Sequence, residues 1–73
     1  MKTDEIRFGG KTYVCRIVKA NDGEDLLIAP TTLLDVLQPG GFNDENEGFA
    51  SKEAENILYK TFNYQNYLSK RTQ

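Results

Sequence analysis

Two adjacent glycines near the start of the chain, Gly9 and Gly10, constrain its fold most strongly. Before them, residues 6–8 alternate between apolar and polar side chains, and after them residues 13–18 are rich in β-branched and aromatic side chains. Both patterns are typical of strands, and a Gly-Gly pair readily takes the positive φ angles of a type I′ turn. The sequence therefore predicts a β-hairpin closed by these two glycines.

This turn also predicts which residues of the hairpin share a face. A two-residue loop places Phe8 opposite Lys11, and each earlier residue opposite a later one in step. Directly paired residues lie on the same side of a sheet. The predicted core face comprises Ile6, Phe8, Tyr13, Cys15 and Ile17. The predicted outer face comprises Glu5, Arg7, Thr12, Val14, Arg16 and Val18.

Turn signals divide the rest of the chain into further elements. Asn21-Asp22-Gly23 is a turn sequence, after which residues 26–29 read as a third strand. Pro30 suits the start of a short helix over residues 31–37, and the sequence Pro-Gly-Gly at 39–41 ends it. Residues 39–50 form a polar loop in which Phe42 and Phe49 are expected to contact the core.

A second helix is expected to begin after Ser51, a favourable N-cap residue. The helix is predicted over residues 51–62, and beyond these it either continues to about residue 68 or frays. Its predicted apolar face comprises Ala54, Ile57, Leu58, Thr61, Phe62, Gln65 and Leu68. The prediction is one small α+β domain over residues 1–73, a three-stranded antiparallel β-meander followed by two helices packed on one face (β-β-β-α-loop-α).

The size and composition of the chain argue against several kinds of chemistry. Its 73 residues include one cysteine, Cys15, and no histidine. An intrachain disulfide, a histidine-based catalytic pair and a cysteine-rich zinc site therefore cannot form. Cys15 is expected in the core as a small apolar residue. We therefore expect no enzymatic activity and no cofactor, and a small core of this kind favours self-association as a source of stability.

Charge and hydropathy bear on location and partners. Residues 1–19 carry a net charge of +3, residues 20–55 carry −8 and residues 56–73 carry +3. The longest apolar run, residues 26–30, is far too short to span a bilayer, and no secretory signal precedes it. Together with the single cysteine, these features favour a cytoplasmic protein without a membrane partner.

A protein–protein interaction module that self-associates is the function that this sequence favours most. Its partner is expected to be a second copy, in a dimer or small oligomer, with another protein as a further possibility. Apolar and aromatic side chains on an outer surface are typical of such contacts. The candidate interface residues are Val14, Arg16, Val18, Tyr64 and Tyr67.

Two alternatives stay open at this stage. One is a binding loop formed by Asn43, Asp44, Glu45 and Glu47. The calcium-loop spacing is incomplete there, because Ala54 stands where the closing acidic ligand belongs. The other is nucleic-acid binding, for which stacking rings and cationic groups are a known combination. It would use a basic outer sheet face and a C-terminal segment, through Arg7, Arg16, Lys11, Lys19, Tyr59, Lys60, Tyr64, Tyr67, Lys70 and Arg71.

Overall fold

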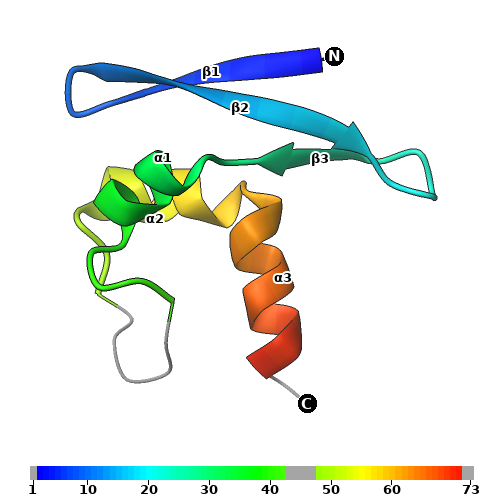
Figure 1. The fold of residues 1–73 in the computed structure, drawn as a ribbon. Coiled ribbons are helices and arrows are strands. Elements are labelled where there is room, and N and C mark those ends of the chain that lie inside the picture. Colours follow the sequence, from blue (N-terminus) through cyan, green and yellow to red (C-terminus); the bar gives the residue numbers. More distant parts are fainter. Residues whose placement is uncertain (1, 43–47, 72–73) are drawn as a thin grey trace.

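The computed structural model describes residues 2–42 and 48–71 (Figure 1). Within them, three strands form one antiparallel sheet in the order β1-β2-β3 and are followed by helices. The elements are β1 (Lys2–Phe8), β2 (Lys11–Lys19), β3 (Asp25–Ile28), α1 (Thr31–Leu37), α2 (Lys52–Tyr59) and α3 (Phe62–Arg71). The predicted α+β class is confirmed, with three helices among these residues where two were expected. None of these helices is long and apolar enough to cross a membrane.

The predicted hairpin is confirmed in both turn and register. Gly9 and Gly10 have φ angles of 61° and 76°, in the left-handed region that glycine enters without strain. Phe8 lies opposite Lys11, and the pairing continues in step to Lys2 at the other end of β1. The turn chemistry therefore sets the faces of β1 and β2.

β3 pairs with the second half of β2 only. Arg16 lies opposite Ile28, and Val18 lies opposite Leu26. The strand ends one residue earlier than predicted because Ala29 has another backbone partner. Its N–H donates to Oδ1 of Asn63 (2.8 Å), and its carbonyl accepts from Nδ2 of the same side chain (3.4 Å). Asn63, from α3, thus takes the place of a neighbouring strand.

The core lies between the predicted core face of the sheet and the three helices, which occupy the same side of the sheet in Figure 1. Its buried members come from β2, from Ala29 just after β3 and from the three helices, and partly buried Ile6 and Phe8 pack against them from β1. The buried cluster comprises Tyr13, Cys15, Ala29, Leu33, Leu37, Ala54, Leu58 and Tyr64. The predicted assignment of Tyr13 and Cys15 to the interior is confirmed.

Local chemistry at α2 follows the sequence prediction. The Ser51 hydroxyl accepts the backbone N–H of Ala54 (3.1 Å) and so caps the helix.

Phe42 and Phe49, which bracket the 43–47 segment, both contact the ring of Tyr64, with centroids 5.6 and 6.1 Å away. Both phenylalanines are therefore joined to the core as expected.

The helix predicted over residues 51–62 ends earlier, at Tyr59, and it neither continues nor frays, because the chain bends at Lys60 and Thr61 and begins a new helix at Phe62. The buried Thr61 hydroxyl donates to the carbonyl of Leu58 (2.8 Å) and accepts the N–H of Tyr64 (3.3 Å). One side chain therefore serves the end of α2 and the start of α3. The bend turns α3 away from the line of α2, as Figure 1 shows.

Candidate interaction surface

The sheet has a second face that no described helix covers. Alternation along the strands directs one set of side chains toward the helices and the other set away from them. All the residues predicted for the outer face are exposed. Among the described strand residues, the outer face comprises Thr3, Glu5, Arg7, Thr12, Val14, Arg16, Val18, Leu26 and Ile28.

An apolar strip runs across this outer face. Val14 is 55% exposed and Val18 is 43% exposed, which are high values for large aliphatic side chains in a strand. Half-buried Leu26 lies opposite Val18, and half-buried Ile28 lies diagonally between the two valines. These four residues, which we call the valine strip, share the outer face, with Arg16 between the two valines along β2. Exposed apolar side chains gathered on one face are typical of contact sites.

Two shallow hollows flank Val14 where β3 leaves the sheet. One has a volume of about 410 Å³, and the other, on the side of the hairpin turn, has about 340 Å³. Val14 and Pro30 line both hollows. They exist because β3 ends at Ile28, so that residues 11–15 of β2 have no strand beside them on this side. Sequence reasoning missed them, since no local pattern predicts where a strand diverges.

The two tyrosines predicted for the interface lie elsewhere. Tyr64 is 5% exposed and belongs to the core, which corrects its expected place on the surface. Tyr67 is half-buried and packs against the same core, with the guanidinium carbon of Arg71 at 5.7 Å from its ring centroid. The bend at Thr61 causes the difference, because it shifts the helical phase and brings these residues inward. The structure therefore unites Val14, Arg16 and Val18 but not the tyrosines.

The basic groups considered for nucleic-acid binding are also divided between two sides. Arg7 and Arg16 lie on the outer face, but Lys19 belongs to the opposite face through its pairing with Asp25. α3, which carries Lys70 and Arg71, lies on the helical side of the sheet (Figure 1). The structure does not bring the arginines of the outer face together with the C-terminal segment.

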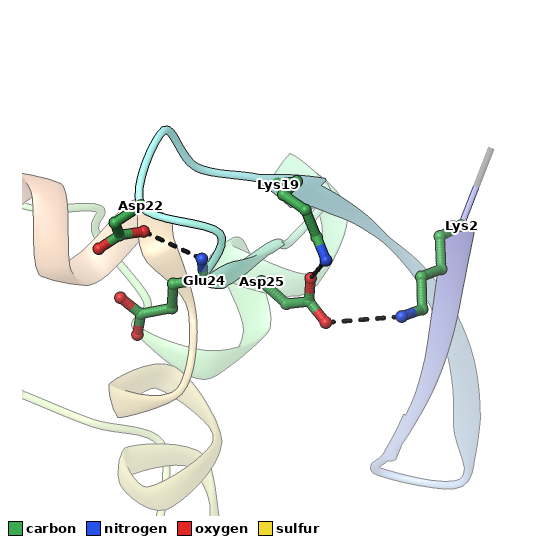
Figure 2. A network of polar contacts seen from close by, with 5 residues as sticks. All are labelled: Lys2, Lys19, Asp22, Glu24 and Asp25. Carbon is green, nitrogen blue, oxygen red and sulfur yellow. Dashed lines mark hydrogen bonds and ion pairs between the residues drawn. The ribbon is translucent and has the colours of Figure 1, made fainter.

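Lys19 is part of an ionic contact that joins all three strands (Figure 2). The Asp25 carboxylate lies 3.4 Å from Nζ of Lys19 and 3.5 Å from Nζ of Lys2. These two ammonium groups, Lys19 first, lower the pKa of Asp25 below its ordinary value of 3.8. Two ammonium groups thus share one carboxylate, and the group of three keeps a net charge of +1.

The remaining reactive groups do not form a chemical site in the part of the chain that the structure describes. Cys15 is fully buried, and burial, reinforced by the nearby Asp4 carboxylate, raises the pKa of its thiol. No three His, Cys, Asp or Glu residues gather there in a way that could hold a metal ion. The predicted binding loop, Asn43, Asp44, Glu45 and Glu47, lies outside the described residues and stays a prediction.

Comparison of the chain with protein-family models, with curated proteins and with solved structures found no match. The assignment of a function therefore depends on the chain's own surfaces.

Proposed function

We propose that this chain is a small, non-enzymatic, cytoplasmic interaction module that self-associates through its outer sheet face. The observation that carries the proposal is the valine strip, with Val14 55% exposed on a face that no described helix covers. Removing such a strip from water on association is favourable in proportion to the apolar area buried. Arg7 and Arg16 beside it supply the cationic groups that are common at contact surfaces.

The chemistry of the chain supports the non-enzymatic part of the proposal. The sequence has no histidine to act as a base near neutral pH. Its single thiol is enclosed, and its raised pKa disfavours the nucleophilic thiolate. A single unpaired cysteine also suits the reducing cytoplasm.

Light scattering across the micromolar range tests this proposal directly. The wild-type chain is expected to have at least the mass of a dimer, whereas Val14→Arg is expected to lower the mass by placing a charge in the valine strip. Asn66→Arg, an exposed site on α3, adds the same charge away from the outer face and is expected to leave the mass unchanged. A wild-type monomer throughout this range, or equal losses for both variants, would contradict the proposal.

A further inference from the structure

β1 is an open edge of the sheet. Its seven residues pair with β2 on one side, and in Figure 1 no described element lies beyond it on the other. Phe8 and Lys11 flank the two-residue turn, so they exchange both backbone hydrogen bonds, and every second residue before Phe8 does the same with β2. The backbone N–H and C=O groups of the alternate residues, Thr3, Glu5 and Arg7, therefore point away from the sheet.

One of these outward groups already has a local acceptor. The N–H of Glu5 donates to Oδ1 of the adjacent Asp4 at 2.9 Å, which agrees with an N–H directed away from β2. The Asp4 carboxylate satisfies this one N–H but leaves the edge open to another strand. Another strand that adds to this edge would replace the carboxylate with a main-chain carbonyl.

The charges along β1 discriminate between the ways in which it could pair with its own copy. Two copies of a strand that pair antiparallel are related by a two-fold axis. A register centred on one residue places that residue opposite its own copy, and places the residue before it opposite the residue after it in the other copy. Registers centred on Glu5 or Arg7 place like charges opposite each other, which is unfavourable. The register centred on Ile6 instead places Glu5 of each copy opposite Arg7 of the other, so that both outward charges are matched.

We propose that β1 pairs antiparallel with β1 of a second copy in this Ile6-centred register. Glu5 and Arg7 then exchange both backbone hydrogen bonds on each side of the axis, and their side chains form two ion pairs on the outer face. The two Ile6 side chains meet on the core face. The sheets become continuous, the helices of both copies lie on one side, and the two valine strips lie on the other. This contact runs along the edge of β1, whereas the proposed face-to-face association uses the valine strip, and Arg7 lies beside both.

Charge reversal at the edge tests both the contact and its register. All chains in this test carry Val18→Lys. This substitution charges the valine strip at a position that pairs with no described residue of β1, and so suppresses outer-face association. Glu5→Arg alone and Arg7→Glu alone each create two like-charge pairs, and we expect dimers about 10- to 100-fold weaker by sedimentation. The double variant restores opposite charges and is expected to regain the dimer.

Mixing the two single variants gives the sharper result. In the mixed dimer, Arg at position 5 of one chain faces Glu at position 7 of the other, and the remaining pair is native. We expect the mixture to associate about as strongly as the parent chain although neither variant does so alone. A mixture no stronger than its components, or a double variant that stays monomeric, would overturn the proposal.

Oxidative cross-linking supplies a second test on the opposite face of the sheet. In the proposed register the two residues at position 6 form a non-hydrogen-bonded pair with Cα atoms about 4.5 Å apart, within disulfide range. Ile6→Cys is therefore expected to form a covalent dimer at least about tenfold faster than Glu5→Cys or Arg7→Cys, because positions 5 and 7 lie opposite each other and not opposite themselves in this register. Cys15 is fully buried and does not compete.

Comparable rates at the three positions would rule out the register. Failure of the outer-face proposal has a different signature, because Val18→Lys would then leave the mass unchanged while the cross-link at position 6 still forms. Association through the outer faces alone would show the converse, with a mass that responds to Val18→Lys and no preference for position 6.

Discussion

The amide side chain of Asn63 fixes the place where the sheet ends. It pairs with the N–H and the C=O of Ala29, which is 4% exposed, and so satisfies both backbone groups of a buried residue that has left the sheet. A buried N–H or C=O without a partner is costly, whereas an amide side chain can match both groups at once. The divergence of β3, and with it the hollows beside Val14, therefore depends on a residue 34 positions away in sequence.

Replacement of Asn63 tests this role. Asn63→Ala leaves the N–H and C=O of Ala29 unpaired in a partly buried site and is expected to destabilise the fold by about 1–3 kcal/mol. Urea unfolding followed by circular dichroism measures the change. Asn66→Ala, an exposed position on the same helix, serves as the matched control and should have little effect. Equal stabilities for the two variants would show that the Ala29 pairing contributes nothing.

At the scale of the elements, Asp25 connects all three strands at the end of the sheet farthest from the Gly9-Gly10 turn. It lies opposite Lys19 in the β2–β3 ladder, and Lys2 reaches it from β1. The core face thus changes along the sheet, from apolar residues beneath the helices to charged residues at this end (Figure 2).

The lowered pKa of Asp25 gives its contribution to stability a defined pH dependence. A carboxyl group whose pKa is lower in the folded state stabilises the fold above its unfolded pKa, and this effect is lost as the pH falls through the folded value. Wild type is therefore expected to be more stable than Asp25→Asn at neutral pH, and the difference should shrink below pH 3.8. Thermal unfolding at several pH values measures it.

The control for this experiment is Asp35→Asn, which removes an exposed acid from α1. Added salt should reduce the difference for Asp25→Asn at neutral pH because it screens exposed ion pairs. A gap between wild type and Asp25→Asn that widens in acid would contradict the assignment.

Elements governed by local chemistry could be predicted from the sequence. The Gly9-Gly10 turn, the strand faces and the Ser51 cap depend on residues close in sequence, and all three are confirmed. The place of the helix bend was not predictable in this way, because it depends on the buried hydroxyl of Thr61. Continuing the helical period through Thr61 placed Gln65 inside and Tyr64 outside, whereas the structure has the reverse.

The candidate surface could be predicted from the sequence only where the faces of its strands could be predicted. Val14, Arg16 and Val18 were placed on the outer face by the period-two pattern and are exposed there. Leu26 and Ile28 joined them only once the β2–β3 register was known, since their segment lacks alternation. Long-range register and strand divergence therefore set the limit of what the sequence alone conveys about this surface.

At the scale of the whole molecule, the core of the described residues lies on one side of the sheet. Each described helix packs on the face that carries Tyr13 and Cys15, and the valine strip lies on the other face. Cys15 is 0% exposed beneath the helices, so that a reagent can reach it only after the helices have separated from the sheet.

Thiol labelling should therefore report unfolding of the molecule. A disulfide reagent is expected to react slowly with native Cys15, because the thiol is enclosed and its pKa is raised, and to react fully once denaturant unfolds the chain. Thr12→Cys supplies an exposed second thiol in the same strand as a reference for unhindered reaction. Native labelling of Cys15 at the rate of that reference would contradict the one-sided core.

Thr61 has a consequence for how such a chain can evolve. Its hydroxyl contacts both helices at a junction that backbone hydrogen bonds from Lys60 and Thr61 also hold, so a change here is expected to alter the direction of the last helix and with it the approach of Asn63 to Ala29. Only serine offers the same oxygen at the same distance from the backbone. Substitution is therefore expected to be tolerated at exposed Lys60, whereas at buried Thr61 only serine is expected to keep the hydroxyl contacts with both helices.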